Sequence, residues 1–424
     1  MCKLIYDEND RIIFTKEMKK EYKILIPNML PIHFELFKNI LIQEQFDCEL
    51  LKDESPNIIK EGLKYTNNDM CYPCILVVGQ FIAALKSGKF NINKTALLIT
   101  QTGGGCRASN YIHILRKALK KAGFLNIPVI SLNLSGLEKN PGFSLNLKLV
   151  RKLISAILYG DILMNLSNQT KPYELKKDET KNLENLWIEK LTKQYENSSG
   201  YGKKALKKNF EAIAKDFSKI KTKKTEKIKV GIVGEIYVKY SKIANNNIED
   251  FLNNEDTEVI IPGLLDFIIF KVDNRIVDID LYGGSKIKRI IYLTFKRYLE
   301  KLQKILIDSI KKYDNFNPPE EFEKTKLNVS PYISYGVKMG EGWLLTAEII
   351  DMIKNGVNNI ICVQPFGCLP NHIVAKGMLR KIINQNKKTN IICIDYDPGA
   401  TKVNQENRIK LMLSSAKENH IQNN

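Results

Sequence analysis

Residues 95–107 read TALLITQTGGGCR, an apolar run followed by a glycine-rich turn that carries Cys106. A shorter version recurs at residues 359–368, NIICVQPFGC, which ends in Cys368. Each stretch predicts a buried strand, a tight glycine turn and then a helix, because short apolar runs bounded by glycine are typical of strands in parallel sheets. The repetition places two thiols on turns rich in unpaired backbone N–H groups, and this setting suits a metal cluster better than a packed core.

Strand-like apolar runs alternate with helical patterns through both halves of the chain. This alternation is the signature of a parallel sheet with crossover helices. A helical, lysine-rich middle segment ends in a polar run near residue 225. We therefore predict an α/β protein with two Rossmann-like (flavodoxin-like) parallel-sheet domains, 1–225 with a helical extension and 226–424. The expected strands are 22–26, 95–100, 128–132, 228–233, 257–261, 359–363 and 391–395, and the expected helices are 31–43, 109–122, 145–162, 182–195, 203–220, 286–310 and 402–415.

The composition, with 44% hydrophobic and 26% charged residues in 424, is that of a folded globular protein. No secretory signal opens the chain, and the longest apolar stretch, 259–270, is well short of the roughly 20 residues that span a bilayer, so we expect a cytoplasmic protein. The eight cysteines lack disulfide-like spacing, which favours reduced thiols. The net charge of +18 has no stacking-aromatic or zinc-finger pattern beside it, so we expect an acidic protein or anionic substrate rather than nucleic acid as the partner.

Four cysteines stand in predicted loops: Cys71 and Cys74 in the sequence CYPC, then Cys106, then Cys368. Iron–sulfur clusters are held by thiolates and tuned by hydrogen bonds to sulfur, which glycine turns and helix N-termini can donate. Zinc is the competing metal, since C-x-x-C is a common half-site, but the chain has no second C-x-x-C. A thioredoxin-like dithiol at Cys71 and Cys74 lacks the expected strand just ahead of it. Two mid-strand cysteines are interpreted as core residues: Cys362 and Cys393.

Five motifs resemble the 2-hydroxyacyl-CoA dehydratase (D-component) family, and within it the branch related to acyl-CoA dehydratase activases and to double-cubane-cluster reductases. The resemblance covers about residues 22–415 and is most specific at the two glycine–cysteine loops. The motifs are NDMCYP at 68–73, TQTGGGCRASNY at 100–111, GEIYVKY at 234–240, FGCLPN at 366–371 and DYDPG at 395–399.

Membership would imply a [4Fe–4S] cluster in the cleft between the two α/β domains, held by three cysteines in the order and rough spacing of Cys71, Cys106 and Cys368. Cys74 departs from the family pattern and leaves open a fourth ligand or a double-cubane cluster. The resemblance also implies an ATP-hydrolysing activase of the sugar kinase and actin fold as electron donor, and an acyl-CoA substrate such as a 2-hydroxyacyl-CoA. The chain has no Walker A sequence, so the ATP is expected on the partner. We also expect a dimer.

Glu235 and His372 are the candidate catalytic residues. Glu235 follows the expected strand 228–233 and either lines the site or caps a helix. His372 comes four residues after Cys368, near enough to donate a proton.

The candidate cofactor-binding residues are those that flank the two cysteines in the glycine loops. The glycines would let the backbone approach a cluster closely, and the arginine would offset its charge. A further glycine-hinged loop, Glu341-Gly342-Trp343, is expected to cover the pocket. The flanking residues are Gly104, Gly105, Arg107 and Gly367.

Two main hypotheses follow. The first is an iron–sulfur reductase or dehydratase component that receives electrons from the activase and passes them to a bound substrate. The second is a non-catalytic iron–sulfur scaffold or electron relay within an activase complex. A basic nucleic-acid-binding protein is a third, which predicts binding to arbitrary duplexes with a steep dependence on salt.

Overall fold

The computed structural model describes residues 3–67, 69–101, 104–133, 138–223 and 225–423, and it contains two four-stranded sheets in which all strands are parallel. The predicted α/β fold with two parallel sheets is confirmed. The strand orders are β2-β1-β3-β4 and β6-β5-β7-β8, so both sheets have the same topology. The strands are β1 (Lys23–Pro27), β2 (Asp47–Leu51), β3 (Thr95–Thr100), β4 (Val129–Leu132), β5 (Ile228–Gly234), β6 (Thr257–Ile260), β7 (Asn359–Pro365) and β8 (Asn390–Tyr396).

The central strands β3 and β7 are buried on both faces, which explains their nearly continuous apolar sequences. Successive side chains of β3 alternate between two cores: Leu97 and Ile99 join one, and Leu98 joins the other. In β7, Ile361 and Val363 likewise face away from Cys362. The order of each sheet reverses direction between two strands, β1 and β3 or β5 and β7, and ligands of such sheets bind outside the carboxyl ends of those strands.

Three helices of the first half, α1, α3 and α4, were not predicted from the sequence pattern. Helix α4 is buried along almost its whole length, and a helix that is apolar all round lacks the one-sided stripe by which helices are recognised. Strand β2 was also missed, because its Asp47 and Glu49 alternate with buried residues at the edge of the sheet. The helices here are α1 (Lys16–Glu21), α2 (Pro31–Gln43), α3 (Asn57–Tyr65), α4 (Tyr72–Lys86) and α5 (Tyr111–Lys121), with 3-10 turns η1 (Ile92–Lys94) and η2 (Arg107–Asn110).

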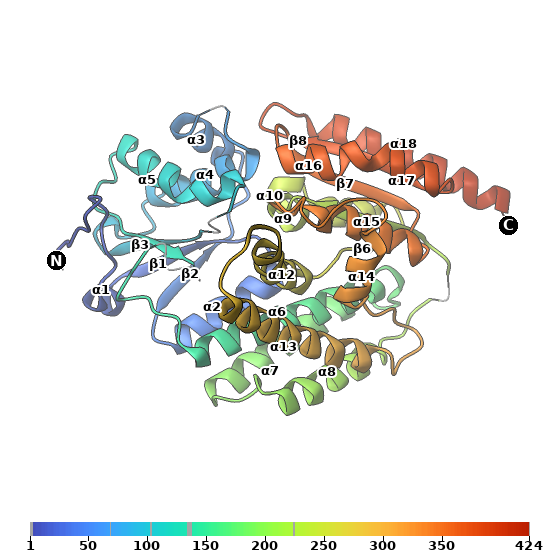
Figure 1. Cartoon of the computed structure of the whole chain (residues 1–424), viewed down its shortest axis with the longest axis horizontal. Helices are drawn as coiled ribbons and strands as arrows, with labels where there is room; N and C mark the ends of the chain where they lie inside the picture. Colours follow the sequence, from blue (N-terminus) through green and yellow to red (C-terminus); the bar gives the residue numbers. More distant parts are fainter. Residues whose placement is uncertain (1–2, 68, 102–103, 134–137, 224, 424) are drawn as a thin grey trace.

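A layer of long helices lies below both sheets in Figure 1 and connects them. Helix α6 contacts α2 from the first half and β6 from the second. Its Asp161 accepts hydrogen bonds from the backbone N–H groups of Leu264 (2.7 Å) and Leu265 (2.9 Å) and lies 2.8 Å from the ring Nε2 of the buried His33. One carboxylate thus ties α2 to the start of α12. The layer consists of α6 (Leu147–Thr170), α7 (Glu179–Glu196), α8 (Lys203–Phe217), α12 (Leu264–Tyr282) and α13 (Lys286–Ile310), with the 3-10 turn η3 (Lys171–Tyr173).

The remaining helices surround the second sheet, and α10 contacts α4 of the first half between the two sheets (Figure 1). Among the described residues, no helix combines the length and the apolar character needed to cross a membrane. These elements are α9 (Ile236–Tyr240), α10 (Lys242–Asn245), α11 (Ile248–Asn254), α14 (Phe322–Val329), α15 (Trp343–Lys354), α16 (Leu369–Val374), α17 (Leu379–Gln385) and α18 (Lys402–Asn423), with the 3-10 turn η4 (Lys376–Met378).

Candidate functional site

Three of the four cysteines that the sequence singles out occupy the same structural position. Cys71 is the N-cap of α4, Cys106 the N-cap of η2 and Cys368 the N-cap of α16. Each has an extended backbone, so its side chain can lie beside the free N–H groups of the turn that follows. Cys106 follows β3 and Cys368 follows β7, the strands at which each sheet reverses direction. Backbone N–H groups at this position can stabilise a thiolate.

Burial and backbone N–H groups have opposite effects on the pKa of these three thiols. Burial is the main effect, and it raises the pKa of each thiol, for Cys71 to about 11. In each case one backbone N–H in the following turn acts in the opposite direction. The groups that lower the pKa are the N–H of Cys74 for Cys71, of Ala108 for Cys106 and of Asn371 for Cys368.

Glu235 is an acidic residue that affects the pKa of all three thiols. It follows β5 directly and caps α9, because its Oε2 accepts a hydrogen bond from the backbone N–H of Val238 at 2.8 Å. Its charge raises the pKa of all three thiols, in addition to the larger effect of burial. Part of the side chain reaches the surface, yet burial and the charge of Glu341 raise the pKa of Glu235 to about 8. Glu235 therefore caps α9, one of the two roles that the sequence left open, and its charge also acts on the three thiols.

The loops of the first half are joined to one another around Cys71. The Sγ atom of Cys71 lies 2.6 Å from the hydroxyl of Tyr111, at the start of α5. Arg107 donates a hydrogen bond to the backbone carbonyl of Asp69, so the arginine expected to offset cluster charge connects the Cys106 loop to the segment before Cys71. Arg107 is itself exposed.

The candidate glycines differ in their surroundings. A Cβ at Gly104 or Gly367 would meet no described atom within 4 Å, and Gly367 has a positive φ of 72° that favours glycine. A Cβ at Gly105 would collide with the Sδ of Met339, at 2.3 Å. Of the same turn, Thr102 and Gly103 lie outside the described residues. Gly105 is thus the glycine that lets the Cys106 turn pack against the second half of the chain.

The loop before α15 completes the site from the second half. A Cβ on Gly340 would lie 3.1 Å from Pro370 Cγ and 4.0 Å from Cys106 Sγ, so this loop lies between the two cysteine turns. Lys271 of α12 donates a hydrogen bond to the carbonyl of Gly340 at 2.5 Å. The nearly buried Glu341 accepts one from the backbone N–H of Ile236 at 3.1 Å. The loop that was expected to cover the site therefore forms one of its walls.

The residues after Cys368 are also close to its sulfur. Asn371 is completely buried, and its Nδ2 lies 3.2 Å from Cys368 Sγ. The Nδ1 of His372 lies 2.8 Å from the carbonyl oxygen of Cys368, and its Nε2 lies 3.8 Å from Asp395. The imidazole therefore faces the end of β8, beside the cysteine rather than over the three thiols.

The other cysteines within the described residues lie in the core. Cys74 is fully buried within the first turn of α4, and burial together with the neighbouring Cys71 raises its pKa. Cys48 is nearly buried in β2. Cys362 and Cys393 face each other across β7 and β8 and are buried, in agreement with their interpretation as core residues.

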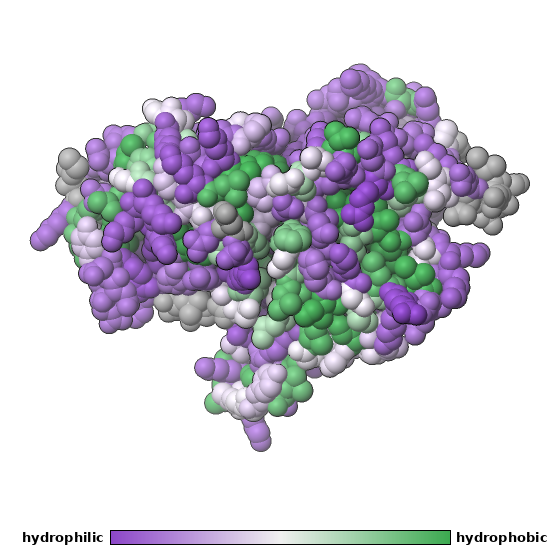
Figure 2. All heavy atoms as spheres, turned by 90° about the horizontal axis from the view of Figure 1, so that it is seen from above, coloured by the Kyte–Doolittle hydropathy of each residue, from purple (hydrophilic) through white to green (hydrophobic). Residues whose placement is uncertain are grey.

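Apolar side chains are exposed around the site. Met339, which packs against Gly105, is 55% exposed, and Phe366 and Leu369, on either side of Cys368, are 65% and 69% exposed. In Figure 2, which shows the molecule from above, apolar residues form green patches within the polar surface. We call the following set the apolar rim: Leu281, Tyr282, Val337, Met339, Phe366, Leu369 and Ile373.

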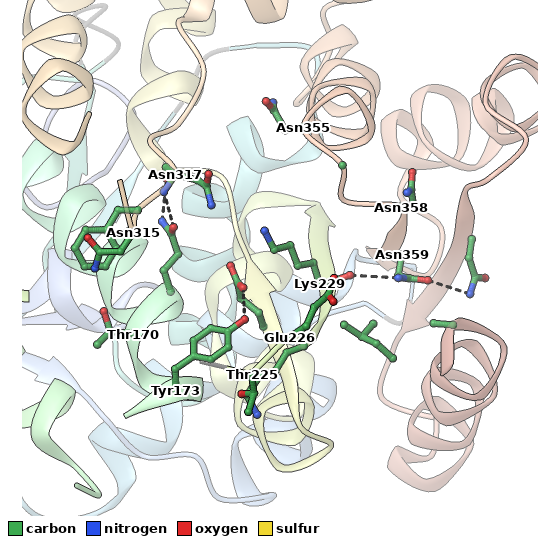
Figure 3. A pocket seen from close by; sticks show the side chains of 18 of the residues that line it. Thr170, Tyr173, Thr225, Glu226, Lys229, Asn315, Asn317, Asn355, Asn358 and Asn359 are labelled. Carbon is green, nitrogen blue, oxygen red and sulfur yellow. Dashed lines mark hydrogen bonds between the residues drawn. The ribbon is translucent and has the colours of Figure 1, made fainter. Parts of the chain in front are cut away.

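A cavity of about 1040 Å³ lies at the opposite end of the second sheet, outside the amino ends of β5, β7 and β8. Its lining is rich in asparagine, threonine and lysine, and Figure 3 shows Asn317, Lys229 and Asn358 around it. Its described lining includes no cysteine and neither of the candidate catalytic residues.

The chain matches no model of a known protein family and no curated protein sequence. Within the described residues, no three His, Cys, Asp or Glu side chains are gathered tightly enough to hold a single metal ion. The family resemblance and the cluster therefore rest on the motifs and on the arrangement of the three cysteines.

Proposed function

We propose that this protein holds an iron–sulfur cluster on Cys71, Cys106 and Cys368, receives low-potential electrons from an ATP-hydrolysing activase, and reduces or dehydrates a bound substrate. The observation that carries the proposal is that three cysteines from distant parts of the chain share the N-cap position, and that the Gly340 loop lies against both the Cys106 turn and the Cys368 turn. Cysteines that served only to fill the core would not need to share the N-cap position.

The donor set fits such a cluster. Each cysteine of a multi-iron cluster binds a different iron, so the thiols need to surround a common space rather than meet at one point. Two of the thiols stand at the carboxyl ends of parallel strands where the sheets reverse direction, and backbone N–H groups beside all three offset the cost of burying thiolates. When bound, the cluster would supply one-electron chemistry. Cys74 would support the fold of α4 in a three-cysteine site and would be a fourth ligand only if that helix were rearranged.

The side chains around the thiols would bind substrate and move protons. Glu235, with its pKa raised to about 8, would carry a proton at neutral pH and could donate it to a substrate oxygen. Lys271, whose pKa is lowered by burial, would place a positive charge near Cys106 and Glu341. His372 and Lys376 both lie 3.8 Å from Asp395, and this group could hold an anionic portion of the substrate, such as that of an acyl-CoA.

The apolar rim supports a protein partner at the site. Exposed apolar side chains gathered around a functional site mark an interaction surface, because water contact with them is unfavourable. We propose the activase, of the sugar kinase and actin fold, as that partner, and a dimer of the present chain as the assembly. We place the complex in the cytoplasm, where thiols stay reduced.

Reduction in the presence of the partner tests this function. The anaerobically reconstituted protein should gain an electron paramagnetic resonance signal when a candidate activase and ATP are added, and should gain none with ADP. Conversion of a 2-hydroxyacyl-CoA to the enoyl-CoA in the same mixture would distinguish an enzyme from an electron relay. Protein that never develops a cluster signal under strong chemical reduction would contradict the proposal.

A further inference from the structure

The side-chain amide of Asn371 connects Cys368 with the loop that forms the opposite wall. Its Nδ2 lies 3.2 Å from Cys368 Sγ and 3.5 Å from Oε2 of Glu341. The other oxygen of Glu341 accepts the backbone N–H of Ile236, so the carboxylate is fixed from its far side. Asn371 is completely buried and Glu341 nearly so. A continuous path of contacts thus runs from the start of α9 to the sulfur.

Only one orientation of the amide satisfies this arrangement. A carboxylate and a thiolate both accept hydrogen bonds, so the NH₂ group must face them. The oxygen, Oδ1, then has no hydrogen-bond partner among the described residues, although it is buried. An unpaired buried amide oxygen is unfavourable, because it has lost its hydrogen bonds to water. The Oδ1 atom of Asn371 thus stays unpaired, while the two N–H bonds of its Nδ2 point towards Cys368 Sγ and the Glu341 carboxylate.

We infer that Asn371 is a positioning residue whose N–H···S hydrogen bond, held by Glu341, sets the reduction potential of the group that Cys368 binds. The inference rests on the proposed function in so far as that group is an iron–sulfur cluster. Hydrogen bonds to cysteine sulfur stabilise negative charge on a cluster and make its reduction easier.

The surroundings of Cys368 differ from those of the other two thiols in the side chain that donates to the sulfur. Burial raises the pKa of this thiol most, the charges of Glu341 and Glu235 raise it further, and the backbone and side-chain N–H groups of Asn371 lower it. Cys71 has the hydroxyl of Tyr111 as its side-chain partner, and Cys106 has Lys271 as a nearby positive charge. Each sulfur therefore has a different stabilising group, and for Cys368 it is Asn371.

Replacement of the amide tests the inference on the loaded protein. Asn371→Leu removes the donor and keeps a similar volume, whereas Asn371→Thr restores a shorter donor. In a redox titration followed by electron paramagnetic resonance, Asn371→Leu should shift the equilibrium towards the oxidised state about tenfold, a potential about 59 mV more negative for a one-electron couple. Asn371→Thr should recover part of the shift. If Asn371→Leu does not fold, Asn371→Ala also lacks the donor, adds no charge and should shift the potential in the same direction.

A second readout needs no metal. In the metal-free protein at a fixed pH, iodoacetamide should modify Cys368 several-fold more slowly in Asn371→Leu than in the wild type, because the thiolate loses a donor. Asn355→Asp, on an exposed loop at the other end of the sheet, is the control and should change neither readout.

The two readouts separate the inference from the proposed function. Wild-type protein that binds no iron would overturn the proposed function, and the alkylation rates would still decide the role of Asn371. A loaded protein whose potential is the same in the wild type and in Asn371→Leu, with equal alkylation rates, would overturn the inference and leave the cluster in place.

Discussion

The two ends of the second sheet are built from the same four strands, yet they have opposite chemistry. Crossover helices run antiparallel to the strands, so helices begin at the carboxyl ends and finish at the amino ends. At the carboxyl end, α9 begins after Glu235 and α16 begins after Cys368, and their free N–H groups favour negative charge. At the amino end lies the cavity of about 1040 Å³, where α6 and α8 finish and free carbonyl groups favour positive charge.

The comparison shows that space alone does not identify a functional site. The cavity is roomy, and its lysines, which include Lys227 and Lys229, lie where helix C-termini would attract them. The carboxyl end carries thiols, carboxylates and a glutamate whose pKa is raised to about 8. Groups with perturbed pKa values that converge from several elements are the stronger indication of chemistry.

The largest expected effect is loss of the cluster from the carboxyl end. Cys106→Ala and Cys368→Ala should each remove most of the iron, because a ligand that the site requires is missing. Cys362→Ala, six residues before Cys368 in the core, should keep its iron and lose about 1–3 kcal/mol of unfolding free energy. Iron content per chain after anaerobic reconstitution checks both. Lys229→Ala, at the amino end, should keep its iron; loss of iron in this variant would contradict the claim that the cluster is bound only at the carboxyl end.

A buried ion pair near the site should contribute far more to stability than an exposed one near the cavity. Lys239 lies 2.9 and 3.2 Å from the two oxygens of Glu348, and both residues are nearly buried. Lys239→Met leaves that carboxylate unpaired and should cost about 3–5 kcal/mol. Lys227 pairs with Asp256, whose side chain is 83% exposed, so Lys227→Met should cost about 0–1 kcal/mol. Urea unfolding of both variants measures the difference, and equal midpoints would contradict it.

Replacing one glutamate at each end of the second sheet, Glu235 or Glu258, should have different effects on turnover. Glu235→Gln should keep the cluster and lower turnover roughly 100-fold, since a general acid contributes at least that factor. In the wild type, turnover should fall as the pH rises through about 8, because Glu235 loses its proton there. That limb should be absent from the pH profile of Glu235→Gln. Glu258→Gln, which alters the partner of Tyr173 at the amino end, should leave both turnover and profile unchanged.

Glycine substitutions should give the smallest effects. Gly340 and Gly356 both have positive φ, 62° and 80°, so alanine at either should cost about 1–2 kcal/mol. At Gly356 the added Cβ meets no described atom within 4 Å, whereas at Gly340 it would press on Pro370 beside Cys106. Gly340→Ala should therefore also weaken iron binding, and Gly356→Ala should not. Thermal unfolding with iron titration compares them, and equal iron affinities would show that the Gly340 loop does not shape the site.

Much of the sheet architecture could be predicted because it depends on local pattern. The apolar runs that end in glycine gave the strands that carry Cys106 and Cys368, and parallel topology predicted that their loops lie at the carboxyl ends. Helix α4 and strand β2 were missed for opposite reasons: one is apolar on every side, and the other carries charges at the edge of its sheet.

The site was predicted less completely, because several of its contacts join residues far apart in the sequence. Nothing local in the segment around Glu341 indicates that it meets Ile236 and Asn371. Tyr111 and Asn371 lie within the recognised motifs, and their polar side chains close to a cysteine were the signal that could have identified them. The difference between Cys71 and Cys74 was also invisible, since it depends on which residue of the CYPC sequence ends outside the helix.

The central claim is that Cys71, Cys106 and Cys368 together hold one iron–sulfur cluster. Iron and acid-labile sulfide, counted per chain after anaerobic reconstitution, test it most directly. The proposed site predicts about four of each for a single cubane, a brown protein, and near-zero values for the variant in which all three cysteines are alanine. A colourless wild-type protein without sulfide, or a triple variant that retains the same iron and sulfide, would contradict it.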